Sequence, residues 1–423
     1  MPAQPHFVSP LSSLPLALMV ACIGPASTGP GAAAAPRQNK VDAAPAIVLL
    51  QSASFDEAEA KAVEILANDP QNSQAHAVAA LTLYKRTVQQ LIQDILAVAV
   101  GASQLGGFNH KYARFALENA ETGFKAVDDH LSVAGADSSF SLNLCPACWK
   151  YDWNRDGQVD WRDESLFQVE RDADAQEIPE GDARRKPTFR FDAGDVHWAR
   201  AWLAFQRAAL SIILAYDWTD LDKIIQELRH SDPDQLVITI RIKDKGRIAN
   251  AKAFILTGFL EADRARESYI AETDDENEWL PNPRQKSHAL PLPVDDKLYE
   301  TWAGVLGDAT RLVEGKEGIS VSELAQLGEH HWANPPRGFL NIGKLLDEPG
   351  DLVFKGATFK EIHHARDDNS QPIENALKEV FGEKYVKEMT ATPLIARLTR
   401  MKKEIDRGEE SFERKLRYLL WLN

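Results

Sequence analysis

The sequence predicts a mainly α-helical protein, built as a multi-helix array with few or no strands. Apolar residues recur at three- and four-residue spacing in most segments after Phe55, as on the buried face of amphipathic helices. Residues that start helices precede several of these segments, including Asp192 and the capping box Ser320–Glu323. The segment Leu236–Ile242 alternates in the manner of a strand, with a helix as the alternative.

The length and charge of the chain limit its class. Its 423 residues are enough for a large core, arranged as two domains or as one extended helical array. The formal net charge of −15 is spread along the chain, which disfavours broad contact with nucleic acid or anionic lipid. We therefore expect no nucleic-acid partner.

The first residues have the composition of an export signal. The apolar stretch Leu14–Ala21 ends at Cys22 and is too short to span a bilayer. It resembles a bacterial lipobox, which implies removal of residues 1–21 as a signal peptide and lipidation of Cys22. Ile23 carries no acidic retention signal, which favours the outer membrane. The alternatives are a soluble periplasmic or secreted protein and a cytoplasmic protein with an apolar start.

Residues 22–50 are predicted to form a flexible tether. Gly, Pro, Ala and Ser dominate Gly24–Pro45, and such a segment buries too little apolar surface to fold. The signal, the cysteine and the tether together predict a lipoprotein of the cell envelope.

Residues 51–135 are predicted to be a helical region. Asp56–Asn68 and Gln74–Arg86 are rich in helix-forming residues and flank a break at Asp69-Pro70. The small residues around this break resemble the junction between two tetratricopeptide repeats, which implies a hairpin of that type. A plain helical hairpin is the alternative. Further helices are predicted at Val88–Val100 and Lys111–Val133.

Residues 136–172 contain a Cys-Pro-Ala-Cys motif and, after it, an acidic loop. Cys145 and Cys148 would be the thiols left after lipidation of Cys22, so in an oxidising compartment we expect them to form a disulfide. Phe140, Leu142 and Leu144 alternate like a short strand before the motif, so a thiol oxidoreductase is one alternative, and free or metal-bound thiols are another. There is no room after Cys148 for a helix that would lower the thiol pKa, which favours a structural disulfide.

Oxygen-bearing residues then follow at the spacing of a calcium-binding loop. Such loops take ligands from positions 1, 3, 5, 7, 9 and 12, with a backbone carbonyl at position 7 and glycine at position 6. Gly157 stands at the sixth position. The predicted ligands are Asp152, Asn154, Asp156, the Gln158 carbonyl, Asp160 and Asp163.

This loop resembles the EF-hand and dockerin-type calcium loops, which implies a bound Ca²⁺ ion. Asp163 replaces the usual glutamate, so modest affinity is expected, and a single copy departs from the paired loops of dockerins. An acidic turn without an ion is the alternative. Trp149, Trp153 and Trp161 lie around the loop and either stack on a partner or pack against the neighbouring core.

The remaining residues, 173–423, are predicted to be a C-terminal helical region. Glu164–Asp172 is expected to be the exiting helix of the loop, and Asp192 to cap a buried helix at Val196–Tyr216. His197 and Arg200 on that helix are expected to be paired polar groups and not ligands. Further helices are predicted at 248–262, 298–312, 320–328, 373–381, 393–405 and 409–422.

A proline-rich loop interrupts this region at Thr273–Val294. A loop of this length is uncommon in a compact body and is often functional. It either presents Trp279, Arg284 and His288 to a ligand or lies across the helices as a bracing strap.

The sequence contains no catalytic signature. The pairs His330-His331 and His363-His364 are too few to predict a second metal site, since adjacent histidines point apart. We therefore expect a calcium-binding envelope lipoprotein that acts as a non-enzymatic scaffold for an unknown protein partner, with membrane contact through its lipid anchor only. The alternative is a metal-assisted envelope hydrolase that uses residues 279–288 or the His363 region.

Overall fold

The computed structural model describes most of the chain. The described ranges are 40–105, 109–153, 157–172, 176–221, 232–286, 288–290, 294–326, 338–358, 371–386 and 388–405. Predictions for the signal peptide, Cys22, Asn154, Asp156, the two histidine pairs and the helix at 409–422 lie outside these residues.

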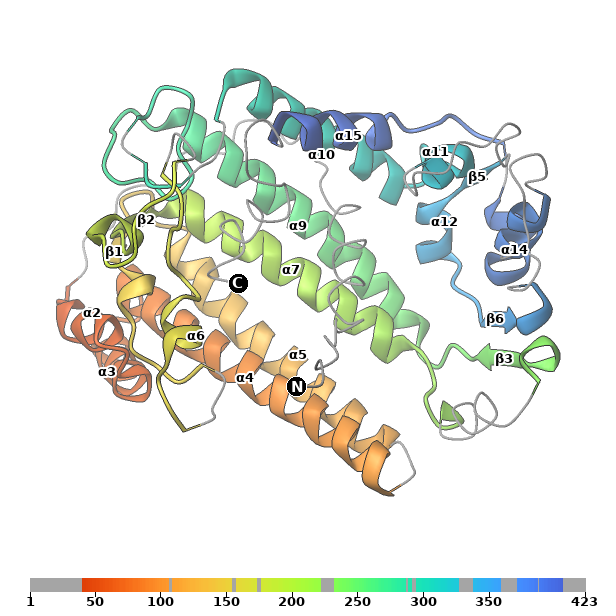
Figure 1. Ribbon diagram of the computed structural model, residues 1–423, viewed down its shortest axis with the longest axis horizontal. Coiled ribbons are helices and arrows are strands. Elements are labelled where there is room, and N and C mark those ends of the chain that lie inside the picture. Colours follow the sequence, from red (N-terminus) through yellow and green to blue (C-terminus); the bar gives the residue numbers. More distant parts are fainter. Residues whose placement is uncertain are drawn as a thin grey trace, which may run out of the picture.

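Four long helices form the body of the molecule and lie side by side (Figure 1). They are α4 (Ser73–Leu105), α5 (His110–Ala134), α7 (Ala193–Ala215) and α9 (Lys245–Ala271). Neighbours in this order pack against one another, and the contact of α7 with α9 is the most extensive. The prediction of a mainly α-helical, multi-helix protein with few strands is confirmed.

Two shorter helices cover one end of α4. They are α2 (Ala44–Gln51) and α3 (Phe55–Asn68). The prediction of a flexible tether as far as residue 50 is wrong for its last part, because α2 buries Ala46 and Leu50 completely against the core. The helices predicted at 74–86 and 88–100 are one continuous helix, α4, since no Gly or Pro interrupts them.

The α7–α9 contact depends on local sequence signals. Asp192 caps α7 by accepting hydrogen bonds from the Gly194 and Asp195 N–H groups, as predicted. Gly258 on α9 faces the ring of Phe205 so closely that a Cβ atom would lie 2.4 Å from it. His197 and Arg200 both contact Glu261, at 2.6 and 2.9 Å, so they are the paired polar groups that we expected.

The segment between α5 and α7 is mostly irregular. It contains β1 (Ser141–Leu144), a 3-10 turn at Pro146–Cys148, the one-turn helix α6 (Trp161–Glu164), a 3-10 turn at Ala183–Arg185 and β2 (Phe189–Asp192). The exiting helix predicted at Glu164–Asp172 is wrong. The backbone after α6 instead pairs with later residues, with hydrogen bonds from Val169 N to Arg185 O and from Ile178 N to Glu170 O.

The C-terminal elements pack beside α9, and α12 (Ile342–Asp347) contacts it as well (Figure 1). Helix α10 (Asp296–Val313) contacts both α9 and α15 (Leu394–Ile405). The predicted strand is confirmed as β3 (Val237–Ile240), antiparallel to β6 (Leu352–Lys355). The other elements are η3 (Pro233–Gln235), β4 (Ile319–Ser320), α11 (Val321–Gln326), β5 (Phe339–Leu340), α14 (Gln371–Phe381) and η4 (Glu383–Tyr385).

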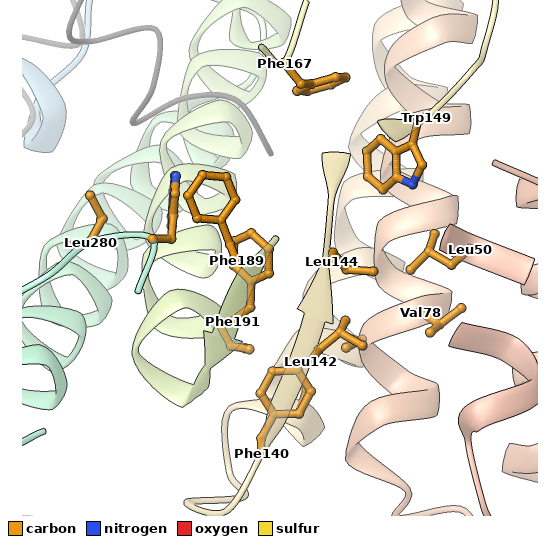
Figure 2. Close-up of a cluster of buried hydrophobic side chains, with 14 of the residues drawn as sticks. Leu50, Val78, Phe140, Leu142, Leu144, Trp149, Phe167, Phe189, Phe191 and Leu280 are labelled. Atoms are coloured by element: carbon orange, nitrogen blue, oxygen red, sulfur yellow. The ribbon is translucent and has the colours of Figure 1, made fainter. Parts of the chain in front are cut away.

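The largest core joins the N-terminal helices to the strands β1 and β2 (Figure 2). Leu142 and Leu144 of β1 stand opposite Phe191 and Phe189 of β2, and all four side chains are buried. Fully burying a side chain of this size stabilises the fold by about 1.5–3 kcal/mol. Within the part of the chain that is described, every helix is too short or too polar to cross a membrane.

Candidate cation sites

The predicted calcium loop is closed across its ends by hydrogen bonds. Oδ2 of Asp152 accepts from Gly157 N at 2.8 Å, and Gly157 has the φ of +90° that favours glycine. Oδ1 of Asp163 accepts from Trp153 N at 2.9 Å, and its Oδ2 accepts from Asp160 N at 3.1 Å. The first and twelfth positions of the loop are therefore held in place by backbone amides.

The carboxylates at positions 9 and 12 have different surroundings. Asp163 is 4% exposed and accepts hydrogen bonds from two backbone amides. Asp160 caps α6 and pairs with Arg162, whose guanidinium hydrogen bond holds the pKa of the Asp160 carboxyl below its usual value. Both oxygens of Asp160 accept from the Arg162 side chain, and Oδ1 also accepts from Arg162 N, so Arg162 would have to turn away for Asp160 to bind a cation. Ca²⁺ fits such an oxygen set, because it takes six to eight oxygen ligands in flexible geometry.

A cluster of aromatic rings fixes the start of the loop. Phe55, the first residue of α3, makes edge contacts with Trp149, Tyr151 and Trp153, with ring centroids 5.0–5.7 Å apart. Phe167 closes the cluster from the other side of the loop. We call these five residues the aromatic cluster. It joins the loop to the N-terminal helices.

Two further features belong to the region of the loop. Cys145 and Cys148 are joined by a disulfide immediately before it. Trp161 differs from Trp149: its side chain is 74% exposed, whereas Trp149 is 4% exposed. Trp161 is thus the tryptophan of this group that is open to contact with another molecule.

A second acidic site, which the sequence did not predict, lies where β2 leads into α7. One carboxylate oxygen from each of Asp192, Glu272 and Glu278 lies within 4.8 Å of the other two. We call these residues the acidic triad. Asp192 is the cap of α7, Glu272 ends α9, and Glu278 follows six residues later in the proline-rich loop. Oxygens bound to one Ca²⁺ at 2.3–2.6 Å lie at most about 5 Å apart, so the spacing fits a hard cation.

The electrostatics of the acidic triad favour either protons or a cation. Burial, together with the hydrogen bond and negative charge of Asp192, raises the pKa of Glu272 to about 10. Burial and the charge of Asp192 raise the pKa of Glu278 to about 7. Oε1 of Glu272 is buried and has no hydrogen-bond partner among the described residues, so it could take a proton or a cation. A divalent cation would replace such protons.

The surrounding residues balance the charge of the acidic triad only in part. Asp195, beside the triad, accepts hydrogen bonds from the Tyr269 hydroxyl and the Asp192 N–H, and burial raises its pKa well above the usual range. Arg190 lies 3.7 Å from Glu278 Oε1, but its shorter contact, at 2.9 Å, is to Asp274.

The proline-rich loop lies packed on the body as a strap. Trp279 is 2% exposed and belongs to the largest core. Arg284 donates to the carbonyls of Ile270 and Glu272 at the end of α9, and His288 Nδ1 lies 3.0 Å from Leu290 O. These contacts favour the bracing strap over a loop that presents its side chains to a ligand.

A compositional signal for the acidic triad exists in the sequence, although it is weak. Five of the seven residues in Glu272–Glu278 are acidic, which usually indicates a solvated turn. Local spacing cannot show that Asp192, eighty residues earlier, joins them. Comparison with family profiles, curated proteins and solved structures gives no match for this chain.

Proposed function

We propose that this protein is a calcium-binding, non-enzymatic helical scaffold of the bacterial cell envelope. In this proposal a lipid on Cys22 anchors it at the outer membrane, and the helical body binds a protein partner. Calcium in the loop of residues 152–163 fastens the N-terminal helices to the central helices.

The observation that carries the proposal is the position of the loop between two parts of the fold. Its start packs through the aromatic cluster onto Phe55 of α3. After its end, a mostly irregular segment and β2 lead to α7. An ion that ordered Asp152 and Asp163 would therefore stiffen the contact between α3 and the segment that leads to α7.

The effect of calcium on thermal unfolding tests this role. Ligand at a hundred times its dissociation constant stabilises the folded state by about 2.7 kcal/mol, so calcium should raise the melting midpoint. The variant with both Asp152→Ala and Asp156→Ala should not respond. A midpoint that ignores calcium and chelator in the unaltered protein would contradict the fastening role.

The anchor has its own test. Expression of the full chain in a bacterium with a radiolabelled fatty acid should label the protein and bring it to the membrane fraction. Cys22→Ser should remove both the label and the membrane association. Membrane association that survives this substitution would exclude lipidation as its cause.

A metal-assisted envelope hydrolase is the second candidate, and the acidic triad is the observation that favours it. Glu272 and Glu278 have strongly separated pKa values, near 10 and 7, and paired carboxyl groups of this kind supply general acid and base in hydrolases. The triad also borders residues 279–288. Hydrolysis of ester or glycoside test substrates with Mn²⁺, lost in Glu278→Gln, would support this candidate over the scaffold.

A further inference from the structure

An apolar cavity lies in the body of the molecule, apart from the calcium loop. Counted as space for the centres of water-sized spheres, it measures about 90 Å³. One water needs only about 10–15 Å³ on this measure. The lining residues come from α4, α5, β1, β2, α7 and the strap: Ala77, Ala80, Leu81, Tyr84, Val127, Leu131, Phe140, Leu142, Leu144, Phe191, Asp195, Val196, Trp198, Ala199, Leu203 and Trp279.

The cavity exists because small side chains stand where two helices face each other. Ala77 and Ala80 line it from α4, and Ala199 lines it from α7. The floor is made by buried residues, among them Leu142 of β1 and Phe191 of β2, which Figure 2 shows within the core. Leu81, Tyr84, Leu131 and Trp198, which are half-buried, complete the lining.

The polar groups of the lining are already used within the protein. The two carboxyl oxygens of Asp195 accept from Tyr269 and from the Asp192 N–H. The Tyr84 hydroxyl accepts from Gln206 Nε2 at 2.7 Å. A buried water needs two to four polar partners, whereas apolar cavities lined by Leu and Phe stay dry and take up benzene or xenon. The lining thus suits an apolar occupant better than water.

We propose that this cavity is a binding site for a small, uncharged, apolar molecule the size of a single ring or a short hydrocarbon chain. A charged group on the molecule would lose its hydration without gaining a partner, so it is excluded. This site does not depend on calcium or on the lipid anchor.

The test uses benzene as the probe and benzoate as its charged counterpart, each titrated into the full-length protein and followed by NMR and by thermal unfolding. Benzene should bind saturably and raise the melting midpoint, and benzoate should do neither. Ala80→Leu fills the cavity and should weaken benzene binding by at least about tenfold, the factor that 1.4 kcal/mol gives. Ala97→Leu, the same change at an exposed position of α4, should leave binding unchanged.

The circular dichroism spectrum establishes whether Ala80→Leu folds. If it does not fold, Ala199→Leu, on the facing wall, replaces it. Absence of benzene binding to the folded unaltered protein would overturn the proposal. Equal binding of benzoate would do so too, as would benzene binding that persists when the cavity is filled.

Discussion

The backbone N–H of Trp153 donates a 2.9 Å hydrogen bond to Oδ1 of Asp163, ten residues later. This bond joins the second and twelfth positions of the predicted calcium loop. The Trp153 ring packs at the same time against Phe55 of α3, at a centroid distance of 5.7 Å. The closure of the loop and its attachment to the N-terminal helices therefore share one residue.

Removing the Asp163 carboxylate should destabilise the protein even without calcium. Asp163→Ala leaves the half-buried Trp153 and Asp160 N–H groups without their acceptor. A fully buried unsatisfied donor costs about 1–3 kcal/mol, so each of these two should cost somewhat less. Urea unfolding in chelator should show this loss. Glu164→Ala, the adjacent change at a half-buried residue, should have little effect. Equal midpoints for the two variants would show that the closure contributes nothing.

The buried ion group around Glu261 should be essential to the packing of α7 on α9. Glu261 is 2% exposed and contacts His197, Arg200 and Arg264 at 2.6–2.9 Å. Glu261→Gln leaves Arg200 without one of its counter-ions, and breaking a buried pair of this kind costs about 3–5 kcal/mol. Glu267→Gln, at a side chain that is 66% exposed, is the matched control. Similar urea midpoints for both variants would contradict this role.

The ion group around Glu261 should also make the protein less stable at low pH. Burial raises the pKa of Glu261, but the His197 hydrogen bond and the Arg200 charge outweigh it, so the pKa lies below its ordinary value. A lowered folded-state pKa stabilises the protein above the unfolded-state pKa of about 4.3, and this is lost as pH falls. The unaltered protein should lose stability below that pH more steeply than Glu261→Gln.

The acidic triad should have the opposite effect: the stability of the protein should fall as the pH rises. The pKa of Glu278 is raised to about 7, so the folded state holds this proton more tightly than the unfolded state does. The resulting stability is complete below about pH 4.3 and is lost as pH rises through 7. In chelator, the urea midpoint should fall between pH 5 and 8.

The matched variants isolate this effect. Glu278→Gln should make the fall smaller, because its amide does not titrate, whereas Glu272, whose pKa is also raised, still contributes to the fall. Glu276→Gln, at a side chain that is 67% exposed, should keep it. An identical fall in all three proteins would exclude Glu278 as its source.

Two glycines should respond to alanine with opposite signs. A Cβ at Gly258 would lie 2.4 Å from the Phe205 ring, so Gly258→Ala should cost about 1–3 kcal/mol by overpacking. A Cβ at Gly101 meets no atom within 4 Å, so Gly101→Ala should stabilise α4 by up to about 1 kcal/mol through helix propensity. Thermal unfolding should show a lower melting midpoint for Gly258→Ala and a higher one for Gly101→Ala. An unchanged midpoint for Gly258→Ala would contradict the close α7–α9 contact.

The helices were predictable because their signals are local. Asp192 caps α7 with a side-chain oxygen two and three residues from its donors, and the sequence contains that whole pattern. The exit helix after the loop was predicted wrongly because long-range pairing decided that segment: Val169 N bonds to Arg185 O. Composition around residue 166 carries no sign of that partner.

The acidic triad shows the same limit. Asp192 stands at the start of α7 and Glu272 at the end of α9, and Glu278 is placed by the packing of the adjacent Trp279 into the core. No spacing rule connects residues 192 and 272. The calcium loop, in contrast, has all its predicted ligands within twelve residues, so the sequence alone was enough to propose it.

Calorimetric titration of calcium into chelator-treated protein lacking residues 1–21 tests the central claim most directly. We predict saturable binding of one calcium ion with modest affinity, lost when Asp152→Ala and Asp156→Ala are combined and retained in Glu278→Gln. Absence of binding, or binding that the loop variant keeps and Glu278→Gln loses, would contradict a scaffold fastened by calcium at residues 152–163.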